Sequence, residues 1–172
     1  MKGINILIEG SDGAGKSTTI QYLQMLLEWP VVKGSDFSHA AQGNEYLFNK
    51  FYKLTDLNNF IFDRCHISNL VYAQLYKDYS ILTPEQVQLI EDKLRDESIV
   101  FYLYADLDVV INRVVNRGDD YVKVDMIKKI RDKYDEVLSQ STLKIVRIDT
   151  TEIEPLDVAK EILRHAGFAA DS

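Results

Sequence analysis

Residues 10–17 read Gly-Ser-Asp-Gly-Ala-Gly-Lys-Ser, and this stretch decides the fold. It matches in full the G-x-x-x-x-G-K-[ST] pattern, a glycine-rich turn whose backbone N–H groups cradle phosphates. The apolar run before it, residues 4–8, predicts a buried strand, and the residues after it predict a helix. A strand, this turn and a helix are the context that the pattern requires. We therefore predict a site for the phosphates of a nucleoside triphosphate.

Each position of this phosphate loop has a physical task. The glycines tolerate unusual backbone dihedrals and let N–H groups approach the phosphates, and the helix N-terminus adds partial positive charge. Lys16 reaches the outer phosphates, and the Ser17 hydroxyl can ligate magnesium. We therefore predict ATP as phosphoryl donor and Mg²⁺ as cofactor. The predicted ATP-binding residues are Gly10, Ser11, Asp12, Gly13, Ala14, Gly15, Lys16, Ser17 and Thr18.

The bulk composition narrows the class of protein. A chain of 172 residues suits one compact domain, so we predict a single domain over residues 1–172. No apolar run approaches the ~18 residues that a membrane span needs. The lone cysteine, Cys65, cannot form an internal disulfide, which fits the reducing cytoplasm. A net charge of −7 disfavours a large nucleic-acid surface, although a local basic groove remains open.

Short apolar runs alternate with amphipathic segments along the whole chain. The runs that predict strands are residues 4–8, 31–32, 60–62, 99–103 and 143–148. This alternation predicts an α/β fold with a five-stranded, mainly parallel sheet and helices on both faces, in three layers. Residues 34–39 are expected to form a loop, and Thr83 with Gln86 predicts a capped helix start. Ligands of such sheets lie outside the carboxyl ends of the strands.

The strand predicted over residues 60–62 ends in a carboxylate, Asp63, followed at once by Arg64. This is the position of the acid that holds magnesium, directly or through water, in phosphate-loop enzymes. An Asp-Arg pair there could position both the metal and an acceptor phosphate. The alternative is an ion pair that only stabilises the strand end. Beside a phosphate loop, we favour the functional interpretation and count both residues as catalytic candidates.

Two further observations favour a kinase over a nucleotide-dependent switch. The chain lacks the Asn-Lys-x-Asp motif that guanine-binding switches carry. Arg113 and Arg117 are four residues apart and so share one helix face. Arginines on a mobile segment can close over a nucleotide and neutralise charge on the transferred phosphoryl group. We therefore predict a P-loop kinase fold with a short lid over residues 113–123; the alternative is a solvated helix face.

Two stretches resemble a known family. Residues 8–18 are similar to the opening of thymidylate kinases and, slightly less closely, of deoxynucleoside kinases. Residues 63–68, Asp-Arg-Cys-His-Ile-Ser, with Val-Tyr-Ala-Gln at 71–74, resemble the Asp-Arg-Tyr segment of thymidylate kinases. There an Asp-Arg pair, a serine and a downstream Tyr-Gln line the acceptor site. The order of elements extends the resemblance to nearly the whole chain, and the family's frequent dimers make a homodimer an expected assembly.

The resemblance implies a role for each matching residue. Ser17 and Asp63 would hold the metal, with Asp63 organising the metal or the attacking oxygen. Acceptor-binding roles fall to Arg64, Ser68 and Gln74. The implied catalytic set is Lys16, Asp63, Arg64, Arg113 and Arg117, of which the last two would stabilise the transition state as lid arginines.

The acceptor half of the chain departs from thymidylate kinases. Residues 33–39, Lys-Gly-Ser-Asp-Phe-Ser-His, stand where that family has Arg-Glu-Pro-Gly-Gly, and Cys65 replaces an aromatic residue. Asp36 lies where deoxynucleoside kinases place the carboxylate that takes a proton from a sugar hydroxyl, so it joins the acceptor-binding and catalytic candidates. Its alternative role is to cap the next helix.

Three functions stay open at this point. The first is phosphoryl transfer from ATP to a deoxynucleoside monophosphate, dTMP or a related pyrimidine nucleotide. The second keeps the donor but uses a hydroxyl acceptor, either a deoxynucleoside or a hydroxyl on DNA, RNA or a modified base, with Asp36 as the base. The third is a nucleotide-binding module without catalysis.

Overall fold

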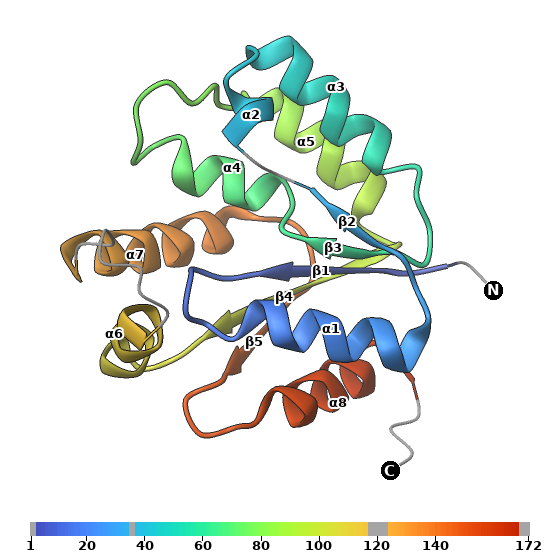
Figure 1. Ribbon diagram of the computed structural model, residues 1–172. Helices are drawn as coiled ribbons and strands as arrows, with labels where there is room; N and C mark the ends of the chain where they lie inside the picture. The colour runs from blue at the N-terminus through green and yellow to red at the C-terminus, as the bar shows by residue number, and fades with distance from the viewer. Residues whose placement is uncertain (1–2, 35–36, 117–123, 169–172) are drawn as a thin grey trace.

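The computed structural model describes residues 3–34, 37–116 and 124–168, and within them the chain forms a three-layer α/β fold (Figure 1). The central five-stranded sheet has the order β2-β3-β1-β4-β5. Each neighbouring pair in this sheet is parallel. Its strands are β1 Asn5–Glu9, β2 Val31–Lys33, β3 Ile61–Asp63, β4 Ser98–Tyr104 and β5 Ile145–Asp149. The predicted fold class is confirmed.

Helices cover both faces of the sheet (Figure 1). Helices α1 and α8 lie on one face, and α3, α4, α5 and α7 lie on the other. The helices are α1 Lys16–Leu27, α2 Phe37–Ala40, α3 Asn44–Leu54, α4 His66–Tyr72, α5 Pro84–Leu94, α6 Leu107–Asn116, α7 Val124–Gln140 and α8 Pro155–His165. The short helix α2 occupies part of the expected loop 34–39, so that expectation was wrong for residues 37–39.

The alternation of side chains along the strands divides the core into two layers. Ile6 and Ile8 of β1 face α1 and α8, whereas Leu7 between them faces the other helical layer. All three are 0% exposed, as expected for a parallel strand buried on both faces. The apolar runs in the sequence therefore reflect burial on two sides. Within the described residues, no helix is both long and apolar enough to cross a bilayer.

Local sequence signals set the start of α5. The Thr83 hydroxyl accepts a hydrogen bond from the Gln86 amide at 3.2 Å, and the Gln86 side chain accepts one from the Thr83 amide at 2.8 Å. Pro84 occupies the first turn. This reciprocal pair is the predicted capping box, which satisfies two N–H groups that a helix start leaves without partners.

The parallel register brings three segments to one edge of the sheet. Ile8 pairs with Asp63, and Lys33 of β2 also pairs with Asp63, so β1, β2 and β3 end side by side. The phosphate loop leaves β1 at this edge and enters α1. Residues 113–116 of the predicted lid form the last turn of α6, and the rest of that lid lies outside the described residues.

Candidate active site at the carboxyl edge of the sheet

Left-handed glycines shape the phosphate loop. Gly13 has φ 82° and Gly15, the N-cap of α1, has φ 85°. A side chain at Gly13 would also bring its Cβ within 3.0 Å of the Val110 carbonyl oxygen. Glycine alone meets both demands at low cost. Because Gly15 has no side chain to cap α1, the first N–H groups of this helix remain available to bind an anion.

The motif lysine meets the strand-end acid. The Nζ of Lys16 donates to Asp63 Oδ1 at 2.7 Å, with side chains 10% and 24% exposed respectively. Ser17 is the next residue and is exposed. The two oxygen donors predicted for a metal are therefore the Asp63 carboxylate, which is paired with Lys16, and the exposed hydroxyl of the residue after that lysine.

This donor set fits a magnesium ion that arrives with the nucleotide. Mg²⁺ prefers oxygen ligands and usually takes only one or two carboxylates, completing its shell with phosphate oxygens and water. The Ser17 hydroxyl and the Asp63 carboxylate are oxygen ligands of this kind. Among the described residues, no group of three or more His, Cys, Asp or Glu could hold a metal without the substrate.

Arg64 is presented by a constrained turn between β3 and α4. Its φ is 69°, an uncommon value for a residue with a side chain. Its amide donates to the Ile8 carbonyl at 2.9 Å. Its guanidinium lies 3.3 Å from Asp12 Oδ1 and 5.1 Å from the centre of the Tyr72 ring. The turn therefore places a cation directly across from the phosphate loop.

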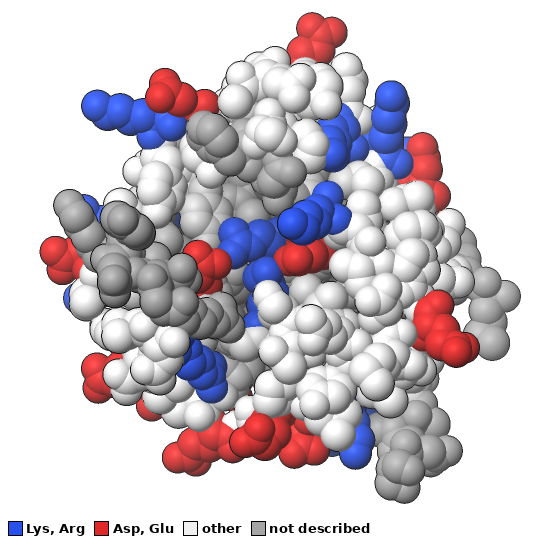
Figure 2. Space-filling view, in the orientation of Figure 1, with Lys and Arg blue, Asp and Glu red and all other residues white. Residues whose placement is uncertain are grey.

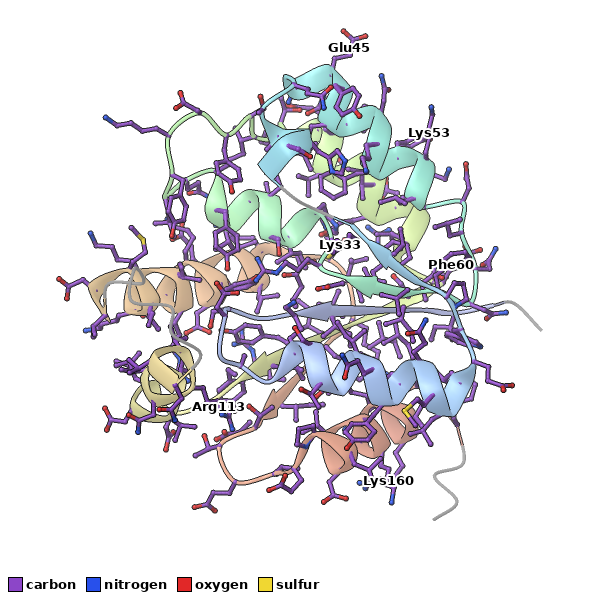
Figure 3. All side chains as sticks on the ribbon, viewed as in Figure 1. Lys33, Glu45, Lys53, Phe60, Arg113 and Lys160 are labelled. Carbon is purple, nitrogen blue, oxygen red and sulfur yellow. The ribbon has the colours of Figure 1, made fainter. Side chains whose placement is uncertain are left out.

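Arg113, on α6, forms a hydrogen bond to the phosphate loop (Figure 3). Its Nη1 donates to the Gly13 carbonyl at 3.1 Å, and its Nη2 donates to the Thr150 carbonyl at 2.9 Å. The Thr150 hydroxyl in turn donates to the Ala14 carbonyl at 2.9 Å. These bonds join α6, the phosphate loop and the loop after β5. Thr150 was not among the site residues predicted from the sequence, and Arg117 lies outside the described residues.

A cavity of about 360 Å³ opens beside this cluster. Its wall combines Gly15, Arg113 and the loop that joins β5 to α8. It lies next to the first turn of α1, where Thr18 contributes to the lining. A cavity contiguous with the phosphate loop is suited to the base and sugar of a nucleotide donor.

A buried carboxylate lies behind the phosphate loop. Glu9, the last residue of β1, is 0% exposed. Its Oε1 accepts from the Cys65 amide at 2.6 Å, and its Oε2 accepts from the Ser68 hydroxyl at 2.6 Å and the Tyr134 hydroxyl at 2.8 Å. Ser68, a predicted acceptor residue, therefore faces a buried acid. An acidic residue closing an apolar strand is the sequence signal that could have revealed Glu9.

Tyrosine rings form a continuous row through the site. The successive ring contacts join Tyr104, Tyr102, Tyr134, Tyr72, Tyr76 and Tyr79, with centroids 5.1 to 6.4 Å apart. Burial, opposed by the nearby Arg64 charge, raises the pKa of Tyr72 to about 12. Burial and the Glu9 charge raise the pKa of Tyr134 well above its ordinary value. Both hydroxyls therefore stay protonated at neutral pH.

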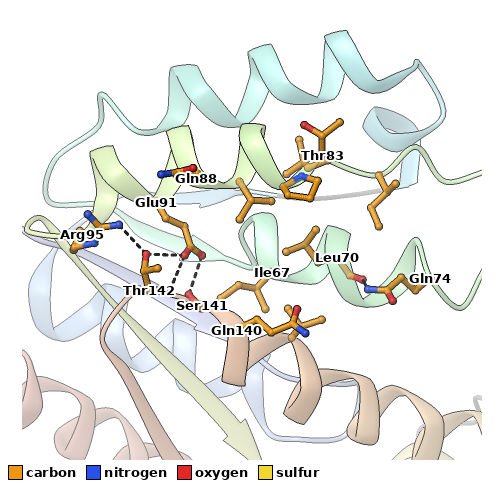
Figure 4. Close-up of a pocket in the computed structure, with 15 residues that line it drawn as sticks. Ile67, Leu70, Gln74, Thr83, Gln88, Glu91, Arg95, Gln140, Ser141 and Thr142 are labelled. Atoms are coloured by element: carbon orange, nitrogen blue, oxygen red, sulfur yellow. Dashed lines mark hydrogen bonds between the residues drawn. The ribbon is translucent and has the colours of Figure 1, made fainter.

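Gln74, another predicted acceptor residue, lies in a different place. It lines a cavity of about 740 Å³ between α4, α5 and α7, whose lining includes no residue of the phosphate loop (Figure 4). Its amide oxygen accepts from Lys133 at 3.3 Å. At one end of this cavity, Glu91 binds the side chains of Ser141 and Thr142. Arg64 is not among the residues that line this cavity, and Asp36 lies outside the described residues.

Charged side chains of both signs gather in a hollow of the face seen in Figure 2. The basic groups at this edge of the sheet include Lys16 and Arg64, which pair with Asp63 and Asp12. Paired charges of this kind can exchange partners when an anionic ligand enters, because carboxylate and phosphate compete for the same donors.

Comparison with protein families identifies the family to which this chain belongs. The family model described as thymidylate kinase matches residues 37–162. The chain belongs to the thymidylate kinase family. The match begins beyond the phosphate loop, so the loop pattern supports the assignment separately. Membership confirms the predicted resemblance to thymidylate kinases, whose matched range includes residues 63–74, and it makes the protein a nucleotide kinase.

Two curated relatives span nearly the whole chain. The SPbeta prophage-derived uncharacterized protein YorR of Bacillus subtilis is 44% identical over 158 residues, which are 92% of this chain and 96% of YorR. A probable thymidylate kinase of Methanocaldococcus jannaschii is 26% identical over 181 aligned positions, covering 92% of this chain and 93% of that protein.

Solved structures support the same fold. The crystal structure of YorR in complex with phosphorylated GDP resembles the present structure, with a TM-score of 0.89 and 42% sequence identity. The match covers 96% of this chain and 99% of the YorR chain. Deoxyadenosine kinase from M. mycoides with bound dCTP gives a TM-score of 0.63 at 19% identity, covering 94% and 100%. The second likeness shows the fold alone.

Proposed function

We propose that this kinase transfers the γ-phosphoryl group of ATP to the phosphate of a deoxynucleoside monophosphate, with dTMP or a related pyrimidine nucleotide as the first candidate. The position of Arg64 carries this proposal. Its guanidinium lies across the phosphate loop from α1, between Asp12 and the Tyr72 ring. A guanidinium binds phosphate in a bidentate manner and holds it rigidly.

The reaction needs positioning and charge neutralisation more than proton abstraction. A monophosphate acceptor is already anionic, so it attacks the γ-phosphorus without a strong general base. The loop N–H groups and Lys16 bind the donor phosphates, and Lys16 must release Asp63 to do so. Ser17 and Asp63 would hold Mg²⁺, which neutralises charge on the donor phosphates when bound.

Arginines of the predicted lid complete the proposal. Arg117 would neutralise charge on the transferred phosphoryl group. Arg113 would share that role, but its bonds to Gly13 and Thr150 support a second task, the bracing of the phosphate loop. The two roles predict different kinetics.

The remaining expectations stay proposals. A hydroxyl acceptor is the alternative, either a deoxynucleoside or a hydroxyl on DNA, RNA or a modified base, with Asp36 as base. Membership of a nucleotide kinase family speaks against a purely nucleotide-binding role. The YorR structure was solved with phosphorylated GDP, so guanine nucleotides belong in any acceptor panel. We also propose a cytoplasmic location and a homodimeric assembly for this kinase.

The test is a direct assay with ATP, Mg²⁺ and a panel of acceptors. The panel holds dTMP, dCMP, dUMP, dGMP and GMP, with thymidine and a short oligonucleotide as hydroxyl acceptors. Formation of dTDP or another pyrimidine diphosphate is the expected result. Arg64→Ala should lower kcat/KM for the monophosphate by more than 100-fold, whereas Arg95→Ala, at the exposed residue that follows α5, should leave it unchanged. Label on thymidine instead, lost in Asp36→Asn, would establish the hydroxyl acceptor.

A further inference from the structure

The buried acid Glu9 ties together three segments that are far apart in the sequence. Cys65 follows the Arg64 turn, Ser68 lies on α4, and Tyr134 lies on α7, which is 125 residues from Glu9 along the chain. A fully buried carboxylate is costly unless donors satisfy it. Three donors within 2.8 Å do so here. The Ser68 and Tyr134 hydroxyls also lie 3.1 Å apart, so the network is continuous.

This network fixes the backbone on one side of Arg64. The Arg64 amide binds the Ile8 carbonyl, and the next amide, that of Cys65, binds Glu9. On the other side, Gly34 approaches so closely that a Cβ there would lie 2.1 Å from the Arg64 carbonyl oxygen. A left-handed residue with a side chain persists only where its surroundings hold it. Glu9 is therefore one of the groups that hold the Arg64 turn.

Tyr134 reaches Arg64 by two routes. Its hydroxyl acts through Glu9 on the backbone of the turn. Its ring packs edge-on against Tyr72, 6.4 Å between centroids, and the Arg64 guanidinium lies over the same Tyr72 ring. Tyr134 belongs to α7, whose first described residue directly follows the predicted lid segment.

We propose that Glu9 and Tyr134 are positioning residues that couple helix α7 to the acceptor arginine Arg64. This proposal deepens the proposed kinase function and rests on it for the meaning of acceptor binding. Neither residue is a catalytic residue, because both side chains are fully buried. Their effect reaches the substrate only through the turn and the Tyr72 ring. On the donor side, the Tyr134 hydroxyl makes only a long contact, 3.5 Å, with the Gly10 carbonyl of the phosphate loop, so we expect the weaker effect there.

The test compares two tyrosine-to-phenylalanine variants of the full chain. Tyr134→Phe removes the hydroxyl that binds Glu9 and keeps the ring. Tyr102→Phe is the matched control, because its ring stacks on Tyr134 at 5.1 Å while its hydroxyl is not one of the three groups that reach Glu9. We expect Tyr134→Phe to raise KM for dTMP about tenfold, the value of one hydrogen bond to a charged group. KM for ATP should change less than twofold in both variants.

A second measurement does not depend on turnover. In ¹⁵N-labelled protein, Tyr134→Phe should shift the amide resonances of Arg64 and Cys65 and speed hydrogen exchange at Cys65 at least fivefold. Tyr102→Phe should leave both resonances in place. Equal changes in the two variants, or unmoved Arg64 and Cys65 amides in Tyr134→Phe, would overturn the coupling. If the amides respond as expected but wild-type protein phosphorylates no monophosphate, the proposed acceptor is wrong and the coupling stands.

Discussion

The ammonium group of Lys16 lies 2.7 Å from the Asp63 carboxylate, so the lysine of the phosphate loop is held by the acid that closes β3. This largely buried ion pair joins the phosphate loop to the end of β3. If Lys16 binds the donor phosphates as proposed, those phosphates compete with the Asp63 carboxylate for its ammonium group.

Removal of that lysine should leave a folded but almost inactive enzyme. We expect Lys16→Ala to lower kcat by on the order of 10²–10³-fold, the usual cost of deleting one group that stabilises transition-state charge. Steady-state kinetics with ATP would measure it. Lys53→Ala, on the exposed surface of α3 (Figure 3), should keep full activity. A Lys16→Ala enzyme within threefold of wild type would refute the assigned role.

The two roles of Arg113 can be separated by kinetics. If its bonds to Gly13 and Thr150 brace the donor site, Arg113→Ala should raise KM for ATP about tenfold and cost about 1–3 kcal/mol of unfolding free energy. A pure transition-state role would lower kcat and leave KM and stability unchanged. Arg147→Ala is the control, since its exposed pair with Asp135 should contribute less than about 1 kcal/mol.

The close contact between Gly34 and the Arg64 turn should make the position of Arg64 sensitive to one added methyl group at residue 34. A Cβ there would lie 2.1 Å from the Arg64 carbonyl oxygen, so Gly34→Ala must displace the turn. We expect KM for the monophosphate to rise at least tenfold, with KM for ATP unchanged. Gly43→Ala is the comparison: φ is 100°, with no atom within 4 Å of the added Cβ. That variant should lose about 1 kcal/mol of stability and no acceptor affinity.

The buried Glu91 should make part of the stability depend on pH. Burial alone would raise its pKa, but hydrogen bonds and attraction from His66, with bonds from Thr142 and Ser141, lower it to about 2. A carboxyl with a lowered folded pKa stabilises the fold fully above its ordinary pKa of 4.5. That contribution is lost as pH falls toward about 2.

The measurement is urea unfolding at pH 7 and pH 3. Glu91→Gln should lower the unfolding free energy by about 2 kcal/mol at pH 7, because buried donors lose a charged partner. The deficit should shrink at pH 3. Asp96→Asn, an exposed change just beyond α5, should show neither effect. A deficit that stays constant between the two pH values would contradict the assigned linkage.

Features governed by neighbours in the sequence could be predicted from the sequence. The phosphate loop, the order of strands and helices and the Thr83 cap each depend on residues within a few positions of one another. The rule that ligands lie at the carboxyl ends of parallel strands also directed attention to Asp63, although its ion pair with Lys16 was not predicted. Element boundaries moved by one or two residues, as strand β3 extends to Asp63.

Contacts between distant segments could not be predicted in the same way. Nothing near Tyr134 in the sequence indicates that its hydroxyl meets Glu9, and the burial of Ser68 against that acid depends on how α4 packs. Gln74 follows Ser68 closely in the sequence but lines a separate cavity, because the helical turn between them changes the direction of the side chain. These positions required the assembled fold.

The tyrosine row and the single tryptophan lie on opposite sides of the sheet, so their spectroscopic signals report on different parts of the protein. Six of its ten tyrosines form that row, next to Arg64 and the phosphate loop. The single tryptophan, Trp29, packs edge-on against Phe168 in the core layer on the opposite side of the sheet. Near-ultraviolet circular dichroism of tyrosine should therefore report acceptor binding in the unlabelled enzyme. Trp29 fluorescence should instead follow the packing of α1 and α8, so that one sample yields two independent signals.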